Sequence, residues 1–149
     1  MLAANLCAIA GAMTVNRELY RGLAGFRFAL RQFLAASEVI SRRRGITPQQ
    51  YQAMLSIAAW DGDTMSVKDL SEQLLLTHHA AVQLIDRTAK AGLVQRTHST
   101  VDRRSVNLTL TGKGEALLET LAAEHLEQML QREPQLSQSL SRLRQVRHP

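Results

Sequence analysis

The segment that most constrains this fold is a predicted β-hairpin whose turn carries two arginines. Apolar and polar side chains alternate over residues 94–98 and again over residues 105–110, which is typical of two paired strands. Arg103 and Arg104 fall in the turn, where a planar, permanently charged guanidinium fits phosphates, base edges and narrow minor grooves. Asp102 is placed to orient Arg104 through a charge-assisted hydrogen bond. A plain polar turn with solvated charges would carry the same residues. The choice between these two interpretations therefore depends on the sequence that precedes the hairpin.

Two predicted helices with the spacing of a helix-turn-helix precede the hairpin. Ser66, with Asp69 three residues later, is a typical start signal for a short helix. After a tight turn Thr77 caps a second helix, which Gly92 ends. One face of this second helix is apolar and consists of Ala81, Leu84, Ile85, Thr88 and Ala89. The opposite face carries His79, Gln83, Asp86, Arg87 and Lys90 and is left free to enter a major groove.

Further helices are predicted on both sides of this region. Apolar residues recur at steps of four and three over residues 19–40, which indicates a heptad seam on one long helix ending at Gly45. Thr47 then caps a helix that should continue to Trp60, with the inward face Tyr51, Met54, Leu55 and Ala58. Thr111 caps a long helix on which His125 is expected to be a hydrogen-bonded core residue. We expect Glu133-Pro134 to interrupt it and leave a short final helix.

Charge and composition favour duplex DNA over other partners. The chain has 18 Lys and Arg against 13 Asp and Glu, a formal net charge of +5, and a basic chain of this size tends to bind polyanions. An aromatic content of 4% offers too few rings for the stacking platforms of single-stranded nucleic-acid or RNA modules. The single cysteine, Cys7, excludes an internal disulfide and a cysteine-rich zinc site, which suits a reducing cytoplasm.

Other classes of function find little support in the sequence. It has no glycine-rich phosphate loop, nucleophile elbow or metal triad, so we expect neither enzyme activity nor a cofactor. His78 and His79 diverge by about 100° on a helix, so no metal site is expected there. Residues 1–13 lack a basic leader and are too short to span a membrane, so residues 1–16 are interpreted as a flexible extension, with Met13 as an alternative start.

The chain resembles the MarR family of bacterial transcription regulators over about residues 19–130. The motifs that carry the resemblance are Ile85-Asp86-Arg87, Lys90-Ala91-Gly92-Leu93-Val94, Asp102-Arg103-Arg104 and Leu110-Thr111-Gly112-Lys113-Gly114. The resemblance implies a mainly α fold with a small β-hairpin wing. It also implies a cytoplasmic homodimer that grips a palindromic DNA site and is often released by a small ligand. The implied divisions are an extension (1–16), a dimerisation helix (17–45), a winged helix-turn-helix domain (46–111) and C-terminal dimerisation helices (112–149).

The chain departs from the family pattern on the predicted recognition helix. Ala80 and Val82 stand where Ser or Thr is usual, Gln83 replaces the usual basic residue, and Thr88 replaces a buried Leu. Base reading is therefore expected from the two histidines and Gln83, and a preference for A·T steps follows from glutamine–adenine pairing and thymine-methyl contacts. The full predicted set of DNA contacts is Thr77, His78, His79, Ala80, Val82, Gln83, Arg87, Arg103 and Arg104.

Two further hypotheses remain open from the sequence. A small aromatic acid could bind among Phe26, Phe33, Tyr51 and Trp60 with Arg27 or Arg31 as its counter-ion, although the same residues could equally form plain core. The winged domain could also be a protein-interaction module without DNA. That alternative would favour apolar or acidic residues on the recognition face, whereas Arg87 and Lys90 there are basic.

Overall fold

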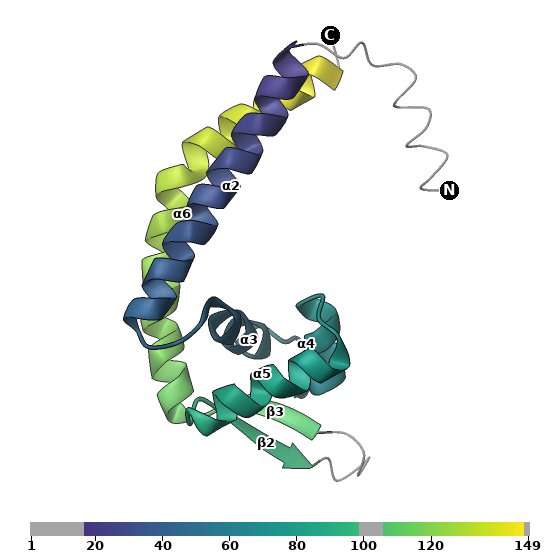
Figure 1. Ribbon diagram of the computed structural model, residues 1–149, viewed down its shortest axis with the longest axis vertical. Helices are drawn as coiled ribbons and strands as arrows, with labels where there is room; N and C mark the ends of the chain where they lie inside the picture. The colour runs from purple at the N-terminus through teal and green to yellow at the C-terminus, as the bar shows by residue number, and fades with distance from the viewer. Residues whose placement is uncertain (1–16, 99–105, 148–149) are drawn as a thin grey trace, which may run out of the picture. The chain divides into compact units, whose positions relative to one another are not determined.

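The structure of the protein, a computed structural model, describes residues 17–98 and 106–147. The elements in these ranges are α2 (Arg17–Arg43), α3 (Pro48–Ala58), β1 (Met65–Ser66), α4 (Val67–Gln73), α5 (His78–Lys90), β2 (Val94–His98), β3 (Val106–Leu110) and α6 (Gly112–Arg147), as Figure 1 shows. The predicted class, mainly helical with a small β-hairpin, is confirmed. In these ranges no helix is long and apolar enough to cross a membrane.

The described residues form two compact units, which are treated separately below. One unit contains residues 37–98 and 106–126, with helices α3, α4 and α5, the three strands, the end of α2 and the start of α6. The other contains residues 17–36 of α2 and residues 127–147 of α6. We call the first the winged unit and the second the helical arm.

The predicted helix starts of the winged unit are confirmed. Thr47 Oγ1 accepts a hydrogen bond from the Gln50 amide at 3.2 Å, and the Gln50 side chain accepts one from the Thr47 amide at 2.9 Å. Ser66 and Asp69 form the same reciprocal box at the start of α4. The Ser66 hydroxyl donates to the Asp69 carboxylate at 2.6 Å and the Ser66 amide donates to it at 2.9 Å, and these two hydrogen bonds lower the pKa of the carboxyl below its ordinary value. Each box satisfies amide donors that a helix end otherwise leaves unpaired.

The predicted inward face of α3 is confirmed for Tyr51 and Met54 and wrong for Leu55 and Ala58. The helix ends at Ala58 rather than Trp60, and Ala53 and Met54 are fully buried, whereas 42% of Leu55 is exposed and Ala58 is exposed as well. An apolar pattern with steps of three and four fits two adjacent faces of this helix equally well. Packing against α5 and β3 selects the face that carries Ala53 and Met54.

The hairpin is the larger part of a three-stranded antiparallel sheet with the order β1-β3-β2. Strands β2 and β3 pair with Val94 opposite Leu110 and His98 opposite Val106. The sequence analysis missed β1, since a strand of two residues shows no alternating pattern. Met65 of β1 lies opposite Leu108 of β3, and both side chains are buried. Strand β3 is therefore held from both sides.

Helix α6 runs without interruption from Gly112 to Arg147, so the predicted break at Glu133-Pro134 and the separate final helix are wrong. Proline fixes φ at about −65°, which is a helical value, but it removes one helical hydrogen bond and crowds the carbonyl four residues earlier, so the continuous helix has to offset this cost elsewhere. Packing in the helical arm supports this stretch. A Cβ on Gly22 of α2 would lie 2.8 Å from the side chain of Leu143, so the two helices approach closely there.

The predicted heptad seam lies on one helix as expected, and part of it packs within the chain: Ile40 is buried, and Leu19, Phe26 and Phe33 are half-buried. In the helical arm, α2 buries Gly22 and Ala29, while 47% of Leu23 and 42% of Leu30 remain exposed. Small residues allow close packing inside the chain, and Leu23 and Leu30 of the seam remain exposed.

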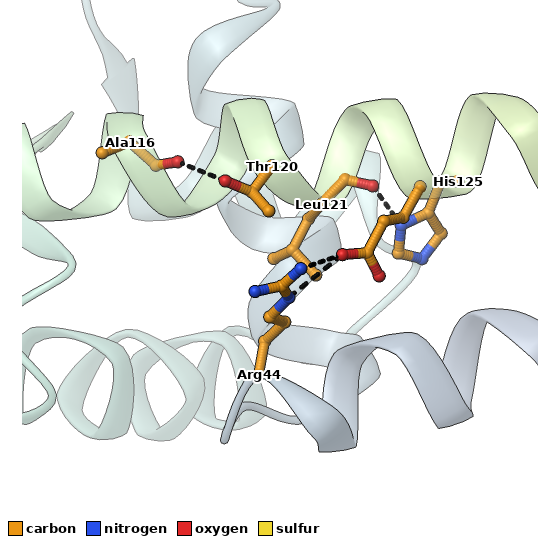
Figure 2. A network of polar contacts seen from close by, with 6 residues as sticks. Arg44, Ala116, Thr120, Leu121 and His125 are labelled. Carbon is orange, nitrogen blue, oxygen red and sulfur yellow. Dashed lines mark hydrogen bonds and ion pairs between the residues drawn. The ribbon is translucent and has the colours of Figure 1, made fainter.

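A buried histidine joins three helices of the winged unit, as the sequence analysis predicted for His125. Its Nδ1 donates to the Leu121 carbonyl at 2.7 Å (Figure 2), which leaves Nε2 to accept from the Ser37 hydroxyl at 2.7 Å. The ring of Tyr51 stacks on it with centroids 4.0 Å apart, and burial raises the pKa of this tyrosine. Arg44, labelled in Figure 2, forms an ion pair with Glu124, which ties the end of α2 to the same stretch of α6.

The start of α6 is locked to the sheet through one glycine. Thr111 donates from its amide to the Leu93 carbonyl at 3.1 Å, and its hydroxyl accepts from the Gly114 amide at 3.0 Å. A Cβ on Gly114 would lie 2.1 Å from the Leu93 carbonyl oxygen, whereas one on Gly112 would meet nothing within 4 Å.

We therefore expect Gly114→Ala to destabilise the protein by about 2 to 4 kcal/mol, because backbone must move to relieve the clash. Gly112→Ala is the matched control, and we expect it to be neutral or to stabilise by up to about 1 kcal/mol, since alanine is the better helix former. Urea unfolding followed by circular dichroism measures both changes. Equal stability of the two variants would contradict the proposed lock.

Candidate nucleic-acid interface

Helix α5 is anchored by one fully buried face. Ala81, Leu84, Ile85 and Thr88 are buried, which confirms the predicted apolar side of this helix. The Thr88 hydroxyl donates to the Leu84 carbonyl at 2.7 Å, so the one polar group in this strip has a partner. Thr77 caps the helix by accepting from the Ala80 amide at 3.2 Å. The helix is thus fixed in its rotation about its own axis, and its other face is presented outward.

The outward face carries most of the residues that the sequence analysis assigned to DNA contact. Thr77, His78, His79, Gln83, Arg87 and Lys90 are exposed, whereas Ala80 and Val82 are half-buried. Val82 packs against the hydrophobic core, so only part of its side chain is available to a partner.

Two of the predicted base-reading residues are in contact with each other. The side-chain nitrogen of Gln83 lies 3.0 Å from Nε2 of His79, one helical turn earlier. Since an amide nitrogen can only donate, this contact requires an unprotonated Nε2 on the histidine. Gln83 keeps its carbonyl oxygen and a second N–H for another partner. The contact orients the amide in advance, which reduces the entropy lost on binding.

Arg96 of β2 contacts α5, and the sequence analysis missed this contact. Its Nη1 lies 2.6 Å from the carboxylate of Asp86, and its Nη2 donates to the Val82 carbonyl at 3.2 Å. A strand arginine is thereby joined to the middle of α5, and the negative charge on the outward face is neutralised. The only sequence signal is an arginine on a solvent-facing strand position, and that does not reveal a partner ten residues earlier.

The predicted wing tip lies outside the described residues. Asp102, Arg103 and Arg104 belong to residues 99–105, and Cys7 belongs to residues 1–16, so these assignments remain predictions. The strands on either side of the tip are described and pair antiparallel, as the predicted hairpin requires.

The residues predicted to hold an aromatic acid are divided between the two units, so this assignment remains a prediction. Tyr51 is a core residue stacked on His125, and Trp60 lines a pocket of the winged unit. Phe26 and Phe33 are half-buried, and the side chains of Arg27 and Arg31 are exposed, all four in the helical arm. Within the described ranges, no group of three His, Cys, Asp or Glu side chains could hold a metal ion.

The family match to known proteins covers the region of the chain that contains the candidate interface. The family profile described as the MarR family matches residues 44–105. The organic hydroperoxide resistance transcriptional regulator of Bacillus subtilis (strain 168) is 38% identical over 74 residues, which cover 50% of this chain and 49% of that protein. The HTH-type transcriptional regulator FarR of Neisseria gonorrhoeae is 32% identical over 103 residues, covering 65% of this chain and 69% of that protein. The chain thus spans about half the length of the first relative.

Solved structures show the same fold. AbsC of Streptomyces coelicolor, described as a MarR family transcriptional regulator, superposes with a TM-score of 0.70 at 20% identity, covering 80% of each chain. The S. aureus MepR-DNA complex contains a chain that superposes with a TM-score of 0.67 at 22% identity, covering 74% of this chain and 81% of that one.

We expect a double-mutant cycle to detect the contact between β2 and α5. Arg96→Met and Asp86→Asn should each lower stability, and their coupling should be about 0.2 to 1 kcal/mol, since the pair is partly exposed. Arg87→Met is the control, because Arg87 has no ion pair with any described residue. Thermal unfolding of the four cycle proteins measures the coupling. A coupling of zero would show that the pair does not hold α5.

Proposed function

This chain belongs to the MarR family, and from that membership we propose that it is a transcriptional regulator that binds double-stranded DNA. The relatives support this proposal, since they are named as transcriptional regulators and one matched crystal structure is a MepR-DNA complex. The observation that carries the proposal is the two-sided character of α5, which buries four side chains and presents a polar face outward. This is the geometry of a recognition helix.

On this proposal the outward residues of α5 divide into base readers and phosphate contacts. Gln83, oriented by His79, can bond adenine through its free amide groups, and His78 lies in the first turn of the helix, which enters a groove first. Arg87 and Lys90 lie in the last turn and supply positive charge for the backbone. Arg103 and Arg104 are proposed to contact DNA from the hairpin, with Asp102 orienting Arg104.

We further propose that the protein acts as a homodimer on a palindromic operator. Leu23 and Leu30 of the heptad seam are 47% and 42% exposed in the single chain, and a second copy would bury them. Two recognition helices related by a two-fold axis would then enter successive major grooves about 34 Å apart. Some relatives are named as repressors, which supports repression as the mode of control. We also propose release from DNA by a small ligand. This proposal is supported by one matched structure, which concerns regulation of DNA binding by 6-hydroxynicotinic acid.

The direct test of DNA binding is fluorescence anisotropy of a labelled duplex at two salt concentrations. We expect affinity to fall steeply with salt, and Lys90→Ala to weaken all duplexes alike while lowering the salt slope by about one. Gln83→Ala should instead flatten sequence preference at one position per half-site, at a cost of about 1 to 3 kcal/mol for the preferred site. Selection of sites from random DNA with both proteins measures this difference.

Two results would contradict the proposal. Absence of duplex binding at low salt would favour the protein-interaction module instead. A site profile unchanged by Gln83→Ala would show that sequence is read by other residues, with His78 the first to test.

Dimer formation has its own prediction. We expect Leu23→Gln combined with Leu30→Gln to convert a dimer to a monomer in sedimentation equilibrium at micromolar concentration, because each substitution places a polar amide in an apolar interface. Leu75→Gln is the control, since Leu75 is 92% exposed in the winged unit and far from the seam in sequence. A wild-type monomer that keeps full specific affinity would contradict the dimeric arrangement.

A further inference from the structure

The winged unit contains a pocket with a volume of about 550 Å³, within the range typical of small-molecule sites. It is bounded by the end of α3 and the loop after it, by β1 and β3, and by the first turns of α6. Buried Met65, Leu108 and Leu118 contribute apolar wall. Leu55 and Ala58, the two residues of the predicted inward face of α3 that the core does not bury, line the same space. These apolar side chains of α3, which are not buried in the core, therefore form part of the pocket wall.

Trp60 gives this wall an aromatic side chain in a fixed position. A Cβ on Gly62 would lie 2.6 Å from the indole nitrogen, so the indole rests directly against the backbone of the loop. Trp60 is half-buried and lines the pocket. An indole is the aromatic surface that best attracts a cation.

The ionisable side chains that line the pocket are all acidic, although the chain as a whole carries a formal net charge of +5. They are Asp63, Glu115 and Glu119, and none of them makes an ion pair with a described residue. Glu124, further along α6, is by contrast paired with Arg44. Glu115 and Glu119 lie four residues apart on one helix face, where two like charges repel each other. A positive ligand between them would relieve that repulsion.

The same observations indicate which kind of positive ligand fits the pocket. The three carboxylates are not grouped as metal ligands, since no cluster in the described ranges could hold a metal ion. A volume of about 550 Å³ with an apolar wall suits a molecule with a hydrocarbon body rather than a bare ion. An aromatic acid, by contrast, would bring a negative charge to a wall that is already negative.

We propose that this pocket binds a small organic cation with a flat apolar body, which packs beside Trp60 while its positive charge lies near Glu115 and Glu119. The binding requires no DNA, and only its effect on DNA affinity rests on the proposed function. Because the pocket wall includes β3 and the start of α6, a ligand there contacts the strand that carries the hairpin. Ligand binding in the pocket would in this way affect the DNA-binding face.

The test uses the full chain and benzyltrimethylammonium as the probe, with fluorescence of Trp60, the single tryptophan of the chain, as the signal. We expect a saturable change with this cation and none with phenylacetate over the same concentration range and ionic strength. Glu119→Gln should weaken cation binding about fivefold, and Glu115→Gln should act in the same direction. Glu72→Gln on α4 removes the same charge outside the pocket and should leave the affinity unchanged.

Equal binding of phenylacetate and the cation, or equal loss in the Glu119→Gln and Glu72→Gln proteins, would overturn the proposal. Glu119 is exposed, so Glu119→Gln is expected to fold, and circular dichroism verifies this. The titration is complete without DNA, so a failure of the proposed DNA binding would leave its result intact. Adding the cation to the anisotropy assay then measures whether occupancy changes duplex affinity.

Discussion

The burial of one strip of α5 is the constraint on which the rest of the molecule depends. Ala81, Leu84, Ile85 and Thr88 fill the centre of the winged unit, where close packing leaves the helix no freedom to rotate. Helices α3 and α4 and strand β2 all contact this helix. The same burial decides which residues face outward, so the chemistry of the candidate interface follows from the packing of its opposite side. Arg96 reinforces this arrangement by joining β2 to the backbone of α5 at Val82.

The parts of the fold that could be predicted from sequence are those with short-range causes. Thr47, Ser66 and Thr77 were identified as helix caps because a cap bonds to an amide three residues away, so its whole mechanism lies within one short segment. The two faces of α5 were likewise predicted, since the change from apolar to polar residues around this helix is unambiguous. Tertiary packing sets the exact residues at which the helices end, but it does not change the caps or the two faces of α5.

The parts that could not be predicted depend on contacts distant in the sequence. Strand β1 exists because Met65 pairs with Leu108, and nothing within two residues signals a strand. Helix α6 continues through Pro134 because tertiary packing outweighs a local cost. The partnership of Arg96 with Asp86 and the exposure of Leu55 arise the same way, from neighbours supplied by the fold. The pocket was missed for this reason, because its acidic residues come from two segments more than fifty positions apart.

Ser66 belongs to two elements at once, and this limits how the domain can change in length. It is the last residue of β1, paired with Asn107 of β3, and its side chain caps α4 through Asp69. No loop separates the strand from the helix, so an inserted or deleted residue at this junction would shift the strand register and displace the cap together. We therefore expect insertions and deletions on this side of the sheet to be tolerated better in the loop between α3 and Met65. That loop carries Trp60 and Asp63, so the pocket can diversify while the helix-turn-helix keeps its geometry.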